Sequence, residues 1–394
     1  MTDRDETASI QILSSLGEID AADWDALANP PGAIYNPFLS HAFLNALEES
    51  GSAVAEAGWL PQHLILERPG KGLSGVLPCY LKSHSQGEYV FDHGWADAFE
   101  RAGGRYYPKL QCSIPFTPAS GRRLLVREDA DADTNRQLLA NGLMQLCDQR
   151  HASSAHITFM PKSEWDFLGE NGFLLREDQQ FHWQNDEYET FDAFLETLAS
   201  RKRKAIKKER RNALSNGIEI DWLTGSDLTE DIWDIFFEFY IDTGSRKWGS
   251  PYLTREFFSF VGERMADQTL LVMARREGQY VAGAINFIGG DALYGRHWGC
   301  IEDHPFLHFE VCYYQAIDYA IAHKKKFVEA GAQGAHKLAR GYMPQLTYSA
   351  HHIPHRGFRE AVEDYLERER KMVESENAMI AHHGPFRKSN QDTQ

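Results

Sequence analysis

The sequence has few cysteines and no long apolar run. Five cysteines are spread over 394 residues, and no two of them form a CxxC pair. This usage is typical of reduced thiols in a cytoplasmic protein. No run of roughly 18 apolar residues occurs, so we expect no membrane-spanning helix. The first ten residues lack the basic-then-apolar pattern of a signal peptide, and we therefore predict a cytoplasmic location.

Several catalytic motifs are also missing. The sequence contains no HExxH, no P-loop and no GxSxG, which argues against a zincin protease, a P-loop nucleotide hydrolase and a GxSxG serine hydrolase. His351 and His352 are adjacent in a predicted strand, so their side chains point to opposite faces and do not form a shared metal site. We therefore expect no bound metal.

Negative charge exceeds positive charge over the whole chain. Lys and Arg total 41 and Asp and Glu total 57, which gives a net charge of −16. An acidic chain is not broadly built to bind DNA or an anionic membrane. Positive charge is nevertheless dense at 201–211, where eight of eleven residues are basic.

On a helix, four of these basic residues share one face: Arg201, Lys204, Lys208 and Arg211. Like charges at this density repel one another, so the face gains from a bound polyanion. We predict that it binds the phosphates of a donor substrate, such as the pyrophosphate of coenzyme A or a tRNA acceptor stem. The alternative is an ordinary solvated helix surface.

The length allows about two domains. Helical patterns alternate with strand patterns, and hairpin signals occur within 63–82 and 269–288. This order predicts an α/β (α+β) fold with a mixed sheet. We place one domain at 1–185 and the other at 186–394. The strand-like segments 89–95 and 294–299 resemble each other, which favours a distant internal duplication over chance.

The segment 309–345 carries the strongest candidate for chemistry. A helix beginning at Phe309 is followed by a short strand at 327–330 and by a Gly-rich loop that presents Lys337. Acyl transfer to an amine passes through an oxyanion that needs a cation or an N–H donor, and the amine must lose a proton. Lys337 could stabilise that charge, and Glu329 could orient the amine or act as a base. An exposed loop lysine is the alternative.

Two further clusters could bind the acceptor. One comprises Arg296, His297 and Trp298 at a predicted strand end, followed by His308 and Glu310, either of which could serve as the base. A single histidine in such a loop is more often structural. The other cluster lies in the first half of the chain and comprises Asp92, His93, Tyr106 and Lys109.

The C-terminal block resembles the FemAB-like group of peptidoglycan biosynthesis/recognition proteins in the GNAT acyltransferase superfamily. The residues that carry the likeness are Glu329-Ala330-Gly331, Gly334, Lys337 and Gly341, together with the position of the basic helix. The resemblance implies two tandem GNAT-like domains, each a mixed, mostly antiparallel sheet flanked by helices. It also implies a role in transfer for Lys337 and an acceptor-binding cleft in the first domain.

The activity implied by the resemblance is transfer of an acyl or aminoacyl group to a small-molecule or peptide amine, with a bacterial cell-wall precursor as one acceptor. Acyl-CoA or aminoacyl-tRNA would be the co-substrate, and no cofactor would stay bound. Neither the usual GNAT pyrophosphate loop nor the long helical arm of Fem ligases is evident, so both donors stay open. A lipid-linked acceptor would bring only peripheral membrane contact. The alternatives are a non-catalytic module that recognises peptidoglycan precursors and an RNA-binding protein.

Overall fold

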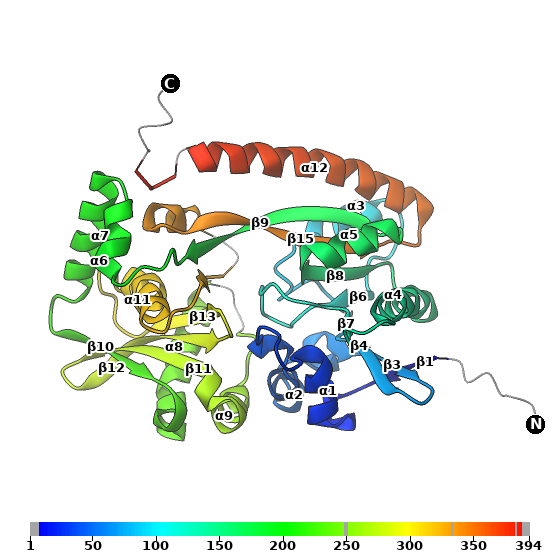
Figure 1. Cartoon of the computed structure of the whole chain (residues 1–394), viewed down its shortest axis with the longest axis horizontal. Helices are drawn as coiled ribbons and strands as arrows, with labels where there is room; N and C mark the ends of the chain where they lie inside the picture. Colours follow the sequence, from blue (N-terminus) through cyan, green and yellow to red (C-terminus); the bar gives the residue numbers. More distant parts are fainter. Residues whose placement is uncertain (1–7, 248–250, 332–333, 383, 388–394) are drawn as a thin grey trace, which may run out of the picture. The chain divides into compact units, whose positions relative to one another are not determined.

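The computed structural model describes residues 8–247, 251–331, 334–382 and 384–387 (Figure 1). They form two compact units. Unit 1 comprises Met1–Asp178 and Leu346–Val373, and unit 2 comprises Gln179–Gln345 and Glu374–Gln394. The chain passes from unit 1 to unit 2 after Asp178, close to the boundary predicted near residue 185. The return of Leu346–Val373 to unit 1 differs from the prediction, which gave everything after 185 to the second domain.

Unit 1 contains two sets of strands. An antiparallel sheet has the order β1-β3-β4-β7, with bounds β1 (Ser9–Leu13), β3 (His63–Arg68), β4 (Gly72–Leu77) and β7 (Leu125–Val126). The other set has the order β15-β8-β6-β5-β2, with bounds β15 (Met343–His352), β8 (Ala155–Met160), β6 (Lys109–Cys112), β5 (Tyr80–Lys82) and β2 (Trp59–Pro61). In this second set, β6 and β8 are parallel, whereas β15 and β8, β6 and β5, and β5 and β2 are antiparallel.

Helices cover these strands because each presents one apolar face. The α-helices of unit 1 are α1 (Ala21–Ala28), α2 (His41–Glu49), α3 (His93–Arg101), α4 (Ala132–Gln149), α5 (Lys162–Glu170) and the first part of α12 (Arg356–His382). Short 3-10 turns lie at η1 (Leu16–Glu18), η2 (Pro37–Leu39) and η3 (Ala55–Ala57). Ser40 caps α2 by accepting a hydrogen bond from the Phe43 N–H.

Unit 2 is built on a sheet with the order β10-β11-β12-β13-β14-β9. The strands are β10 (Ile218–Leu223), β11 (Thr269–Arg276), β12 (Gln279–Ile288), β13 (Ala292–Cys300), β14 (Phe327–Glu329) and β9 (Leu174–Gln184), of which residues 182–184 pair with β14. Among the described residues of this sheet, β13 and β14 run parallel and the other neighbouring strands run antiparallel. The sheet is therefore mixed and mostly antiparallel.

Both faces of this sheet are covered, which explains the continuous apolar run in β12. Gly283 faces α8, because an added Cβ would meet Phe236, whereas Ala282 and Ala284 pack in the core with α11. The helices and turns of unit 2 are α6 (Phe191–Thr197), α7 (Ser200–Ala213), η4 (Gly225–Asp227), α8 (Glu230–Lys247), α9 (Arg255–Arg264), η5 (Ala266–Gln268), α10 (Leu307–Phe309), η6 (Glu310–Tyr314), α11 (Gln315–Ala322) and η7 (Ala335–Arg340). Figure 1 shows α6 and α7 as a helix pair.

Three local expectations need correction. The segment 88–95 was expected to be a strand, but Tyr89 has a positive φ of 59° and α3 begins at His93. The likeness between 89–95 and 294–299 is therefore not structural, because the second segment lies in strand β13. The expected loop around Lys337 is the 3-10 helix η7, and the expected helix from Phe309 contains a π-helical turn at η6.

Within the described part of the chain, no helix is both long enough and apolar enough to cross a membrane.

Candidate functional site

A β-bulge between β12 and β13 shapes the centre of unit 2. Ala284 pairs with Trp298 and Asn286 pairs with Gly295, so Arg296 and His297 together oppose a single residue of β12. An extra residue in one strand bends that strand and re-aims its side chains. Around the bulge, the Trp298 ring packs against His308 of α10, whereas the His297 ring packs against Tyr240 of α8.

The helix that follows is irregular at the same place. Residues Glu310–Tyr314 form a π-helical turn between α10 and α11. Such a turn inserts one extra residue into the helix and is often found at functional sites. Phe306, just before α10, has a left-handed φ of 67°. The irregular segment of the helix and the bulge of β13 therefore line the same small region.

A small cavity lies between these two irregular segments. Its volume is about 70 Å³, and its walls come from β12, β13, α10, η6 and the residue after β14. The lining residues are Ala284, Asn286, Gly295, Arg296, His297, Trp298, His308, Cys312, Tyr313 and Ala330. Four of the residues predicted from sequence, Arg296, His297, Trp298 and His308, thus meet at one cavity.

Buried charge surrounds this cavity. The Arg296 guanidinium lies 4.0 Å from a Glu329 carboxylate oxygen, and both side chains are almost fully buried. His182 lies 4.0 Å from the other oxygen of Glu329. Lys337 is 2 % exposed, and its ammonium donates a 2.8 Å hydrogen bond to the Gly331 carbonyl. Neither Lys337 nor Glu329 lines the cavity.

Burial shifts the protonation of these groups. Desolvation lowers the pKa of Lys337 from 10.5 to about 8. Desolvation, with the charges of Lys337 and Arg296, lowers the pKa of His182 to about 3. Desolvation and the Arg296 charge lower the pKa of His297 to about 4. Both histidines are therefore neutral at neutral pH.

Aromatic rings hold the remaining wall residues in place. The His308 ring packs edge-on against Trp298, with centroids 5.2 Å apart, and against Tyr313 at 5.4 Å. The His297 ring packs against Tyr240 of α8 at 5.0 Å. His336, in η7, lies 3.0 Å from the hydroxyl of Tyr313. The two cavity histidines are thus fixed by ring contacts.

The basic helix α7 divides its charges between two faces. Arg210 is turned inward, where it binds Glu310 at 2.8 Å and Asp318 at 2.6 Å. Glu209 accepts a 2.9 Å hydrogen bond from Arg340 of η7. The four residues predicted to bind phosphate, Arg201, Lys204, Lys208 and Arg211, are all exposed, and none of them lines the cavity. The structure does not bring this face and the Lys337 ammonium together in one hollow.

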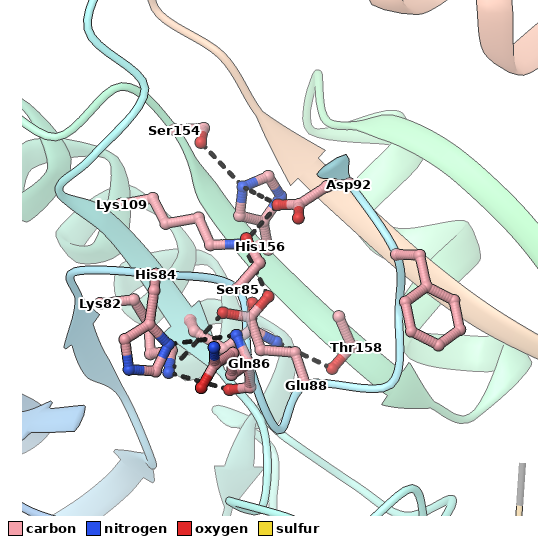
Figure 2. Close-up of polar contacts among 12 residues, drawn as sticks. Lys82, His84, Ser85, Gln86, Glu88, Asp92, Lys109, Ser154, His156 and Thr158 are labelled. Atoms are coloured by element: carbon pink, nitrogen blue, oxygen red, sulfur yellow. Dashed lines mark hydrogen bonds and ion pairs between the residues drawn. The ribbon is translucent and has the colours of Figure 1, made fainter. Parts of the chain in front are cut away.

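Unit 1 holds a second buried polar network (Figure 2). Lys109 binds Glu88 at 2.6 Å and also contacts Asp92. Tyr106 donates a 2.6 Å hydrogen bond to Asp92. His156 is bonded to the Ser154 hydroxyl at 2.7 Å. Three residues predicted to bind the acceptor therefore bind one another.

The charges of this network stabilise each other. Desolvation opposes the charged form of Asp92, but Lys109 holds its pKa well below the usual range. Desolvation likewise opposes the charged form of Lys109, yet Glu88 and Asp92 raise its pKa. Desolvation raises the pKa of Glu88 to about 7, although the Lys109 charge opposes this rise. His93, in contrast, is exposed at the start of α3, with its ring 6.3 Å from Phe91.

Sequence reasoning missed part of each cluster. Asn286 and Cys312 line the unit 2 cavity, and Lys82, Glu88 and His156 belong to the unit 1 network. Asn286 could have been found from the sequence, because it is a single amide inside the apolar run of β12. Within the described residues, no group of three or more His, Cys, Asp or Glu could hold a metal ion.

The two units, with their sheets flanked by helices, define an α/β protein, as the sequence predicted. The chain belongs to the FemAB-like family, described as peptidoglycan biosynthesis/recognition, whose model matches residues 15–388. No curated protein matches the sequence.

Two solved structures share this fold. The crystal structure of FemX is 13% identical, with a TM-score of 0.55, and the match covers 88% of this chain and 98% of that chain. A conserved protein of unknown function from Bacteroides thetaiotaomicron VPI-5482 is 12% identical, with a TM-score of 0.51 and coverage of 88% and 100%. At these identities the likeness concerns the fold.

Proposed function

We propose that unit 2 transfers an acyl or aminoacyl group from a phosphate-bearing donor to an amine, within peptidoglycan metabolism. The observation that carries this proposal is the cavity at the β12–β13 bulge, which has the buried Arg296 guanidinium in its wall. A preorganised cation in a water-poor site stabilises a developing oxyanion far better than an exposed cation does. Membership of the FemAB-like family supports the same chemistry and a cell-wall precursor as acceptor.

In this proposal, each residue has a distinct role. Arg296 faces the oxyanion of the tetrahedral intermediate, and His308 takes the proton that the amine loses. Glu329 holds Arg296 in place through their 4.0 Å contact. Lys337 anchors the loop after β14 through the Gly331 carbonyl, so its effect on transfer passes through the position of Arg296 and Glu329.

The exposed face of α7 would hold the phosphates of acyl-CoA or aminoacyl-tRNA. Replacing Arg201, Lys204, Lys208 and Arg211 by Gln should raise the donor KM roughly tenfold at low salt, because several exposed charge contacts add up. It should also flatten the dependence of KM on salt. The exposed Lys324→Gln is the control. An unchanged KM would exclude this face from donor binding.

Mass spectrometry tests the activity directly. The protein is incubated with acyl-CoAs or aminoacyl-tRNA and with amine acceptors, including peptidoglycan precursor peptides, and the products are identified. Arg296→Gln should lower the transfer rate about 10²–10³-fold, because one oxyanion contact is lost. Arg276→Gln is a matched control, since Arg276 pairs with Glu302 outside the cavity. No transfer from any donor by folded protein would contradict the proposal.

A second candidate is a non-catalytic module that binds peptidoglycan precursors in the cytoplasm. The family description names recognition as well as biosynthesis, which is the reason for keeping it. This candidate predicts that a precursor peptide or lipid-linked sugar binds without turnover, and that binding survives both Lys337→Ala and Arg296→Gln. Turnover that depends on Arg296 would exclude it.

A further inference from the structure

The cavity in unit 2 is lined by a buried amide whose oxygen has no hydrogen-bond partner among the described residues. Asn286 is 1 % exposed and lies on β12, in the wall of the cavity. Its Nδ2 faces the carbonyl oxygens of Leu270 and Ala284, each at 3.4 Å. Its Oδ1 has no hydrogen-bond partner among the residues that the structure describes. A buried acceptor left without a donor costs about 1–3 kcal/mol, so such an atom calls for a ligand.

The orientation of this amide follows from its surroundings. A rotation that exchanged Oδ1 and Nδ2 would place an oxygen against two carbonyl oxygens. The acceptor atom is therefore the one that faces the cavity side.

Space in front of Oδ1 is kept open by Gly295. A Cβ added at Gly295 would lie 3.3 Å from Oδ1 of Asn286, 3.6 Å from the Glu329 carbonyl oxygen and 3.8 Å from Cα of Ala330. These atoms thus surround one small volume that a side chain at residue 295 would fill. The cavity of about 70 Å³ has room for only a few atoms, because one water needs at least 10–15 Å³.

The charges around the cavity determine whether the group that donates a hydrogen bond to Oδ1 is charged or neutral. Arg296 lines the cavity, and the Lys337 ammonium is near enough for the Arg296 charge to lower its pKa. Nearby positive charge disfavours a bound ammonium and lowers its pKa. An uncharged N–H donor satisfies Oδ1 without this repulsion.

We propose that this cavity binds the reacting nitrogen of an uncharged primary amine on an unbranched carbon, with one N–H donated to Oδ1 of Asn286. The binding follows from the cavity itself, whereas its use in transfer rests on the function proposed above. The rest of the acceptor lies outside, because the cavity holds little more than a CH₂–NH₂ group.

This contact is compatible with the whole reaction. The nitrogen lone pair forms the new C–N bond, and the bond between the acyl carbon and the donor's sulfur or oxygen breaks. One N–H proton passes to His308 and then to the departing group. The other N–H stays on the product amide and keeps its hydrogen bond to Asn286. A tertiary amine offers no N–H and is not bound in this way.

Fluorine NMR with trifluoroethylamine tests the proposal, since this small amine is mostly unprotonated at neutral pH. Its signal should broaden and saturate with the wild-type protein. Asn286→Leu removes the acceptor, and Gly295→Ala fills the space in front of it; each should weaken binding at least roughly tenfold. The N,N-dimethyl derivative should not bind. Thr269→Val, a buried strand residue outside the cavity, is the control, and circular dichroism shows that each variant is folded.

The outcomes separate this inference from the proposed function. Equal binding to wild type, Asn286→Leu and Gly295→Ala would overturn it, as would no binding to folded wild type. If transfer occurs and Asn286→Leu keeps the wild-type kcat/KM for primary amines, the proposed function stands and this inference fails. If the amine binds through Asn286 but no donor supports transfer, the inference stands and the proposed function fails.

Discussion

The buried polar network of unit 1 and the buried charges of unit 2 are built differently. In unit 1, Lys109 contacts both Glu88 and Asp92, so these two carboxylates share one cation within hydrogen-bond distance. In unit 2, Arg296 and Glu329 are 4.0 Å apart, and the Lys337 ammonium binds a backbone carbonyl instead of a carboxylate. A cavity adjoins the second cluster.

The difference distinguishes charges that stabilise the fold from a charge that can interact with a substrate. A buried ion pair in direct contact is costly to break and gains little from a ligand. A cation held at longer range beside a cavity still has interaction energy to give to a developing negative charge. We therefore assign the chemistry to unit 2 and a mainly structural role to the inner residues of the unit 1 network.

Of the substitutions that test this comparison, Lys109→Met should have the largest effect on stability. It leaves two buried carboxylates without their common partner, which should lower the free energy of unfolding by about 3–5 kcal/mol. Urea denaturation measures the loss. Lys162→Met is the control, because Lys162 is exposed and pairs only with Asp166 on the same helix, so its midpoint should hardly move. A Lys109→Met protein as stable as wild type would show that the network is not structural.

Lys337→Met should give a smaller, pH-dependent effect. Burial lowers the pKa of Lys337 from 10.5 to about 8, so between these values the unfolded chain binds a proton that the folded protein does not. The free energy of unfolding then rises with pH by up to about 1.4 kcal/mol per pH unit.

Below pH 8 both states are protonated, and this contribution is constant. Denaturation curves of wild type and Lys337→Met across that window measure the contribution. The rise should be absent from the variant, and equal slopes in both proteins would mean that the Lys337 ammonium is not buried as the structure shows.

The sequence predicted elements whose pattern is local. The hairpin within 269–288 follows from turn residues and side-chain periodicity, and the structure confirms it as β11 and β12. The segment 88–95 failed because its aromatic alternation resembles a strand, whereas a left-handed Tyr89 and the apolar face of α3 decide its structure.

The candidate site was predicted only in part, for a physical reason. Arg296, Trp298 and His308 lie near one another in the chain, and they meet at the cavity. The exposed face of α7 was expected there too, but Arg210 binds Glu310 and turns the other cations outward. The positions of Asn286 and of the neighbouring bulge depend on strand register, which no local pattern fixes.

The central claim is that transfer occurs at the unit 2 cavity, and one measurement tests it most directly. The transfer rate of His308→Asn is compared with that of His323→Asn, a histidine that stacks on Tyr319 outside the cavity. The account predicts a loss of about 100-fold or more for His308→Asn and a wild-type rate for His323→Asn. Equal rates for the two folded variants would contradict it.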